Sequence, residues 1–270
     1  MKRSAKLGKR KVGVALSSGA AAGFAHIGVL AVLEREGIPI DMMAGASVGA
    51  LIGALYAQGK DIDEIGRVIT DLGRKRVYHV ARLALIKMRF IKDDERKYWL
   101  RATVGDVEFK DLKIPFACVA TDIYTGEEVV IKDGSVREGV RASGSFPVIV
   151  PIVKRDGRYL VDGGLVNPVP VSVLKEMGAD FIIAVNAIAD NSRRPESESK
   201  KPNIFKIMKQ TIHIARYQAV RLSLDGASVV IEPRLPKIRF GDWHRAQDSI
   251  LQGELAAQRA IPEIKRLLEA

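Results

Sequence analysis

The feature that most constrains the fold is a regular alternation of short apolar runs with longer helical patterns along the 270 residues. Short apolar runs are typical of buried strands, whereas apolar positions three or four residues apart are typical of helices. The predicted strands are residues 12–16, 39–43, 114–121, 127–132, 149–153, 159–161, 181–186 and 229–231. The predicted helices are residues 24–35, 48–58, 62–72, 136–143, 169–177, 204–224 and 249–268. This alternation predicts an α/β fold with a mostly parallel central sheet and helices on both faces.

The domain organisation predicted from the sequence is simple. No convincing linker divides the chain, so we expect residues 1–11 to be a basic N-terminal extension and residues 12–270 to form a single domain. Residues 12–33 carry no charge when His26 is neutral, which is a pattern that signal peptides and membrane spans share. The glycines and serines within that stretch favour a strand, a loop and a buried helix instead.

The net charge of +11 limits the classes of partner. Such a charge suits nucleic acid, an anionic membrane or an acidic substrate, or it simply keeps the surface well solvated. Aromatic residues make up only 6% of the chain and no nucleic-acid-binding motif is recognised, so no nucleic acid partner is expected. Residues 74–101 hold ten Lys or Arg interleaved with apolar residues. This stretch is predicted either to lie on an anionic membrane or to form a solvated helix.

A candidate nucleophile lies between the second predicted strand and the following helix. The residues from Gly45 to Gly49 read GASVG, which is a G-x-S-x-G pattern centred on Ser47. In a strand–turn–helix context this pattern forms a nucleophile elbow, because small neighbours allow the sharp turn that presents the serine hydroxyl. The N–H groups at the start of the next helix stabilise negative charge that develops there. An ordinary turn remains the alternative.

A second small-residue segment, SSGAAAG at residues 17–23, follows the first strand. Its backbone N–H groups could bind an oxyanion or a phosphate, or the segment could simply allow close packing of helix on strand. The dinucleotide and Walker fingerprints are both absent.

The general base has one strong candidate and several weak ones. Asp162 ends an apolar strand and is followed by two glycines, and carboxylates at strand ends face a cleft in α/β proteins. An ordinary Asp-Gly turn is the alternative. The four histidines fit poorly, since none follows a late strand in a short loop. They are His26, His79, His213 and His244. Cys118 lies in an apolar run and is predicted to be a buried thiol.

Taken together, these segments resemble the patatin-like phospholipase family, in particular its bacterial single-domain members. The likeness spans about residues 12 to 190 and rests on five quoted segments. They read VALSSGAAAGFAHIGVLAVLEREGI, MAGASVGALIGALYA, ATDIYTGE, RASGSFPVIVPI and YLVDGGLVNPVPV. The resemblance implies a patatin-like three-layer sandwich and hydrolysis of acyl esters of lipids. It implies no metal ion and no other cofactor for the chemistry.

The resemblance also implies roles for particular residues. Ser47 would be the nucleophile and Asp162 its base, in a Ser–Asp dyad that needs no histidine. An oxyanion hole would form from Ser18, Gly19, Ala20 and Val48. The substrate would be an acyl lipid, such as a phospholipid or a lysophospholipid. We expect a cytoplasmic protein that makes peripheral contact with membranes.

The glycine-rich loop departs from the family pattern G-G-G-x-R/K-G. Ser18, Ala20 and Ala22 stand at the first glycine, the third glycine and the basic position. If position 20 requires a positive φ, alanine there adds strain of about 1 kcal/mol or more. The alternative hypothesis is therefore a catalytically weak relative that acts as a regulator or adaptor and binds lipid or protein.

Overall fold

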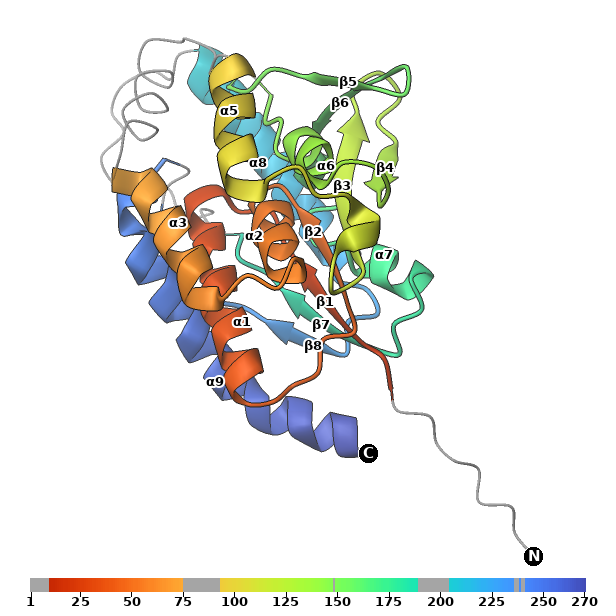
Figure 1. Cartoon of the computed structure of the whole chain (residues 1–270), viewed down its shortest axis with the longest axis vertical. Coiled ribbons are helices and arrows are strands. Elements are labelled where there is room, and N and C mark those ends of the chain that lie inside the picture. Colours follow the sequence, from red (N-terminus) through yellow and green to blue (C-terminus); the bar gives the residue numbers. More distant parts are fainter. Residues whose placement is uncertain (1–9, 75–92, 148, 189–203, 236–237, 239–240) are drawn as a thin grey trace, which may run out of the picture.

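The computed structural model describes residues 10–74, 93–147, 149–188, 204–235, 238 and 241–270, and these form one mixed sheet between two layers of helices (Figure 1). The strands are β1 Val12–Leu16, β2 Met42–Ala46, β3 Phe116–Asp122, β4 Glu128–Ile131, β5 Val153–Arg155, β6 Arg158–Asp162, β7 Phe181–Val185 and β8 Val229–Ile231. The α-helices are α1 Ala25–Arg35, α2 Val48–Ala57, α3 Ile62–Arg74, α5 Asp93–Val104, α6 Val136–Ser143, α7 Val171–Glu176, α8 Ile204–Ser223 and α9 Ala246–Glu269. Four short 3₁₀ helices are η1 Ala20–Phe24, η2 Phe109–Asp111, η3 Gly163–Leu165 and η4 Trp243–Arg245.

The sheet is mostly parallel, as the alternation of elements predicts. Its order is β5-β6-β3-β2-β1-β7-β8, and β4 also pairs with β3. All the pairings among β3, β2, β1, β7 and β8 are parallel, whereas β4, β5 and β6 join in antiparallel fashion. Every residue of β1, β2 and β7 is buried, because helices cover both faces of these central strands.

Alternate strand residues feed two separate apolar cores. On β1, Val12, Val14 and Leu16 belong to the larger core, and Ala15 faces the smaller one. The larger core contains side chains of α1, α2, α3, α5, α6 and α9; the smaller one contains side chains of α7 and α8. Within the larger layer α1, α3 and α9 pack side by side (Figure 1). The predicted three-layer α/β sandwich is therefore confirmed.

The ends of β2 and β6 meet along one side of β3, and this meeting positions the candidate site. β2 runs parallel to β3 and ends with Ala46 opposite Val119. β6 runs antiparallel to β3 and ends with Asp162 opposite Ala120, the next residue along. Since β4 occupies the other side of β3 at both positions, β2 and β6 approach each other end to end. The residue after β2 is Ser47.

Two further predictions from short sequence patterns, an N-cap at Asp61 and a hairpin turn at Asp156-Gly157, are confirmed. Asp61 caps α3, because its Oδ1 accepts hydrogen bonds from the backbone N–H groups of Asp63 and Glu64 at 2.9 and 3.1 Å. The turn between β5 and β6 is formed by Asp156 and Gly157, with φ of 49° and 77°. Positive φ at both central residues is the geometry that lets a two-residue hairpin follow the strand twist.

Two predicted strand boundaries are wrong. The second strand is Met42–Ala46 rather than residues 39–43, because Gly45 pairs with Leu16 and Cys118 inside the sheet instead of opening the turn. Residues 149–152 do not extend the hairpin, which begins only at Val153. Residues 1–9 lie outside the described part, so the division at residue 11 stays a prediction.

Candidate active site

Ser47 occupies a strained turn between β2 and α2. Its φ of 56° and ψ of −118° lie in a region that residues with a Cβ rarely adopt. The flanking glycines make the turn possible: a Cβ on Gly45 would overlap the carbonyl of Gly49, and a Cβ on Gly49 would overlap the carbonyl of Leu16. The G-x-S-x-G pattern is thus required by the backbone itself.

The Ser47 hydroxyl is hydrogen-bonded to Asp162. Ser47 Oγ donates to Asp162 Oδ2 at 2.6 Å, a short distance that is typical of a hydroxyl bonded to a carboxylate. The other carboxylate oxygen, Oδ1, accepts the N–H of Gly164 at 2.8 Å. Gly163 cannot carry a side chain, because a Cβ there would overlap the carbonyl of Val119 on β3. The Asp-Gly-Gly sequence therefore lets the chain fold tightly over β3 and fixes the carboxylate.

Asp162 is 2% exposed, and burial raises the pKa of its carboxyl above the ordinary value. Hydrogen bonds from Ser47 and Gly164 and the nearby guanidinium groups of Arg216 and Arg96 act in the opposite direction, but burial has the larger effect. A raised pKa makes this carboxylate a better proton acceptor than an exposed aspartate.

The last residue of α6 and the turn after it hold both members of the pair. Ser143 Oγ accepts the backbone N–H of Ser47 at 2.8 Å. Two residues later, the carbonyl of Ser145 accepts the backbone N–H of Asp162 at 3.0 Å. The quoted segment RASGSF contains both serines, but its composition gave no sign of this role.

Arg96 on α5 stabilises the turn that follows α6 through two hydrogen bonds. Its guanidinium donates to Ser145 Oγ at 3.1 Å and to the carbonyl of Arg141 at 2.7 Å. Arg141 in turn forms an ion pair with Asp93 on α5 at 3.1 Å. Although burial lowers the pKa of Arg96 to about 10, the group remains a cation at neutral pH. In the sequence Arg96 is one of the ten basic residues of 74–101, and nothing there indicates its hydrogen bonds to Arg141 and Ser145.

The small-residue loop after β1 lies against Val48 and Gly164, which follow closely after the two members of the pair. A Cβ on Gly23 would overlap Val48, and one on Gly164 would lie only 2.5 Å from Ser18 Oγ. The loop is anchored by Ser17, whose Oγ accepts the N–H of Ala187 at 2.9 Å. A second anchor comes from α9, where Ser249 Oγ donates to the carbonyl of Ala21 at 3.1 Å.

Within the loop, the residues predicted to form an oxyanion hole differ in their surroundings. The N–H of Ser18 donates to the carbonyl of Pro168 at 2.9 Å, so it is already engaged. Ser18 Oγ is buried and has no hydrogen-bond partner among the described residues. Ala20 has a φ of 51°, the positive value at which alanine is strained. Val48 is the first residue of α2, where an N–H has no acceptor within its own helix.

The histidines occupy other places. His26 is fully buried, and its Nε2 lies 2.8 Å from the carbonyl of Ser17. Burial lowers its pKa to about 4, so the ring is neutral. His213 lies on α8 with its Nδ1 3.5 Å from Arg216, His244 lies in η4, and His79 is outside the described residues. Cys118 is buried as predicted.

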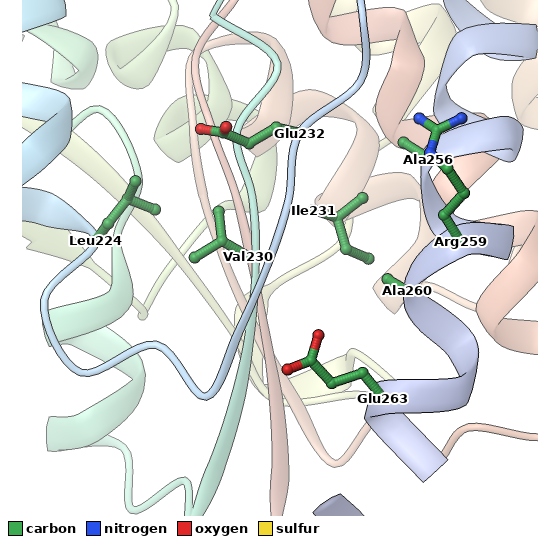
Figure 2. Close-up of a pocket in the computed structure, with 8 residues that line it drawn as sticks. All are labelled: Leu224, Val230, Ile231, Glu232, Ala256, Arg259, Ala260 and Glu263. Carbon is green, nitrogen blue, oxygen red and sulfur yellow. The ribbon is translucent and has the colours of Figure 1, made fainter. Parts of the chain in front are cut away.

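A hollow of about 550 Å³ lies elsewhere, between the edge strand β8 and α9 (Figure 2). It is lined by Leu224, Val230, Ile231, Glu232, Ala256, Arg259, Ala260 and Glu263. It contains neither Ser47 nor Asp162, and nothing in its lining is suited to acyl transfer. Within the described residues, no group of three or more His, Cys, Asp or Glu side chains is arranged to hold a metal ion.

Most of the basic stretch at residues 74–101 lies outside the described residues, which resume at Asp93. Its predicted membrane contact therefore stays a prediction. Among the helices that the structure describes, none is both long and apolar enough to cross a bilayer.

Comparison with known proteins finds relatives for a large part of the chain. An uncharacterized NTE family protein of Mycobacterium tuberculosis is 31% identical over 194 residues, which are 72% of this chain and 53% of that protein. Lysophospholipase nte1 of Emericella nidulans is 34% identical over 195 residues, 70% of this chain and 13% of that protein. This chain thus spans about half of the first relative and a small part of the second.

The fold also resembles a solved structure. VipD from Legionella pneumophila aligns with a TM-score of 0.54 at 15% identity, over 93% of this chain and 67% of that chain. The sequence profile named "Patatin-like phospholipase" matches residues 14–175, a range that includes Ser47 and Asp162. Because that match covers more than half of the 270 residues, the chain belongs to the patatin-like phospholipase family.

Proposed function

We propose that this chain is a serine hydrolase of lipid acyl esters, with Ser47 as nucleophile and Asp162 as the only acid–base partner. The observation that carries the proposal is the 2.6 Å hydrogen bond between the Ser47 hydroxyl and the buried Asp162 carboxylate. Membership of the family supports the reaction class, and the name of the lysophospholipase relative supports an acyl lipid as substrate.

The reaction proceeds by two acyl transfers. Asp162 Oδ2 accepts the proton of Ser47 Oγ while that oxygen attacks the ester carbonyl carbon. The tetrahedral intermediate collapses, the bond to the leaving alcohol breaks, and the alcohol takes the proton from Asp162. Water then attacks the acyl-enzyme while Asp162 accepts its proton. The second tetrahedral intermediate collapses, the bond from the acyl carbon to Ser47 Oγ breaks, and Oγ takes the proton back from Asp162 as the fatty acid leaves.

The oxyanion is bound by backbone N–H groups. Val48 offers the first free N–H of α2, and Gly19 and Ala20 offer those of the adjacent loop, whereas the N–H of Ser18 is engaged with Pro168. Such donors need no side-chain charge, so the hole tolerates Ala22 at the basic position. Because Ala20 already adopts the positive φ, its strain should reduce the rate of hydrolysis without abolishing it.

The raised pKa of Asp162 sets the pH dependence. The base must be ionised to accept a proton, so kcat/KM falls as pH decreases through that pKa. Because burial places the pKa above the ordinary range of aspartate, the loss begins at a higher pH than an exposed aspartate would give. The Asp162→Asn protein should lack this acid limb.

The test is covalent labelling with a fluorophosphonate probe, together with hydrolysis of a lysophospholipid in micelles. Ser47→Ala should abolish labelling, and Asp162→Asn should lower both labelling and turnover at least about 10³-fold. Asp122→Asn is the matched control, since Asp122 is a buried carboxylate at the end of β3 that accepts the N–H of Tyr124. It should keep labelling within about threefold of the parent.

A second candidate function follows from the strained Ala20 in the loop. The chain would then be a catalytically weak regulator or adaptor that binds lipid or protein. It predicts a folded protein that the probe does not label. If labelling appears once Ala20 and Ala22 are changed to Gly and Arg, the loop is the altered part; if it still does not appear, the hydrolase proposal is wrong.

A further inference from the structure

The outward face of α8 is unusually apolar. Ile204 and Ile214 are 60% and 53% exposed, and Leu222 is 82% exposed. Three further large apolar side chains of the same helix are also exposed, namely Ile207, Met208 and Tyr217. The helix runs on the far side of the sheet from α2 (Figure 1).

The distribution reverses that of an ordinary surface helix, which turns its apolar stripe inward and its polar side outward. Here Val220 packs in the smaller core, and the inward side also holds the buried guanidinium of Arg216. Positions 204, 207, 214 and 222 lie within about 80° of one another around the helix at about 100° per residue, so these four side chains share one face, and Met208 and Tyr217 flank it on opposite sides. Several large apolar side chains exposed on one helix face indicate an interaction surface.

The charge of α8 indicates what covers that face. Its 20 residues contain four Lys or Arg, of which Arg216 is buried on the inward side, and no Asp or Glu; the chain as a whole has a net charge of +11. Arg221 is exposed beside Leu222. A cationic helix with exposed apolar residues is complementary to a bilayer that contains anionic lipid. A second copy of the chain would bring like charges together and is disfavoured for that reason.

The position of the helix suits this partner. α8 contacts η3, the 3₁₀ turn that directly follows Asp162. The guanidinium of Arg216 is close enough to the Asp162 carboxylate to affect its pKa. A bilayer on the outer face of α8 would therefore lie one helix away from the candidate site.

We propose that the outward face of α8 is a docking surface for the anionic lipid bilayer. It belongs to another segment of the chain than the basic stretch at residues 74–101. It does not depend on catalysis, because binding uses only apolar contact and cationic charge.

The first experiment measures binding to sucrose-loaded vesicles in the Ser47→Ala background, so that hydrolysis cannot alter the membrane. The vesicles are pure phosphatidylcholine or phosphatidylcholine with about 30% phosphatidylglycerol. Ile207→Asp/Ile214→Asp should lower the partition coefficient on anionic vesicles at least about tenfold, because two apolar contacts are lost and two negative charges are added. The matched control is Leu251→Asp on α9, where Leu251 is 52% exposed and its change should have less than about a twofold effect.

The second experiment locates the contact without a disruptive substitution. Because Cys118 is fully buried, a cysteine introduced by Ile214→Cys can be labelled selectively with an environment-sensitive fluorophore. Anionic vesicles should shift its emission to the blue, and 0.5 M salt should weaken the shift. The same fluorophore at Leu251→Cys should report no change.

The outcomes are decisive in both directions. Loss of binding in the Asp pair together with a blue shift at position 214 supports the proposal. Unchanged binding of the pair, equal binding to both vesicle types, or no binding by the parent protein overturns it. A dimer in sedimentation velocity that the Asp pair dissociates, without vesicle binding, would instead assign the face to a second copy of the chain. Fluorophosphonate labelling of the chain with Ser47 intact tests the hydrolase separately, so either proposal can fail alone.

Discussion

The turn at Ser47 and the loop at residues 17–24 both hold a non-glycine residue at positive φ beside the candidate site, but they are supported differently. At Ser47 the flanking Gly45 and Gly49 make room within the motif, and Ser143 holds the amide of the serine. In the loop, the strained Ala20 replaces the glycine of the family pattern.

The anchors of the loop come from distant parts of the chain. Ser17 is held by Ala187, and Ala21 by Ser249, both of which lie beyond the residues 14–175 that match the family profile. At Ser47 the room for the turn is therefore made by glycines of its own motif, whereas two anchors of the loop lie in the C-terminal third of the chain. The first three predictions below test how firmly each region is held, and the fourth tests the strain at Ala20.

The largest expected effect is at the turn that contains Ser47. Gly49→Ala would press a Cβ into the carbonyl of Leu16, so the free energy of unfolding should fall by about 3 kcal/mol. Gly66→Ala on α3 is the control, since the nearest atom to its added Cβ is 4.0 Å away. It should stabilise the protein by up to about 1 kcal/mol, measured by urea unfolding. Equal effects of the two substitutions would contradict the steric argument.

The next effect concerns the support of the loop by His26. The fold lowers the pKa of His26 from 6.5 to about 4, so it favours the neutral ring. Its contribution to stability is complete above pH 6.5 and is lost as pH falls towards 4, by about 3 kcal/mol in all at 1.36 kcal/mol per unit. His26→Gln can still donate to the carbonyl of Ser17 but does not titrate. Between pH 7 and pH 4, the free energy of unfolding should therefore fall by about 3 kcal/mol less in the His26→Gln variant than in the parent protein.

A smaller effect is expected at the turn that holds Ser47. Ser143→Ala leaves the amide of Ser47 without its acceptor, which should cost about 1–3 kcal/mol of stability and lower kcat by about tenfold or more. Ser135→Ala is the control on the same helix, because Ser135 caps α6 through the N–H of Glu138. It should cost about 1 kcal/mol without changing kcat. A drop in kcat for both would show that the effect is general destabilisation.

The smallest effect is at Ala20. Ala20→Gly should raise the free energy of unfolding by about 1 kcal/mol, because glycine adopts a φ of 51° without strain. Ala22→Gly in the same 3₁₀ helix lacks that benefit and should lower stability by about 0.5–1 kcal/mol. The contrast is measured by thermal unfolding of the two variants. A destabilising Ala20→Gly would mean that the loop is not strained there.

Much of the fold could be predicted because its signals are local. The capped start of α3 at Asp61 and the Asp-Gly hairpin depend on residues a few positions apart, and both are present in the structure. The second strand was misplaced because Gly45 reads locally as a turn residue, whereas its pairing with two neighbouring strands keeps it in the sheet.

The candidate site could be predicted only in part, because some of its contacts join residues that are far apart in sequence. Ser47 and Asp162 could be proposed from the sequence because each lies in a short motif at a strand end. Ser143 and Arg96 could not be linked to the turn at Ser47, since nothing near them in sequence shows that they support it. The engaged amide of Ser18 was missed too, because its partner Pro168 is brought close only by folding.

The sequence by itself determined the α/β alternation, the turn at Ser47 and the placement of Asp162 at a strand end, since periodicity and glycine positions act over a few residues. Only the tertiary structure decided that these two side chains, 115 positions apart, would share a hydrogen bond. The reason is that β6 runs antiparallel to β3 and meets the end of β2, and strand order and register depend on packing across the whole sheet.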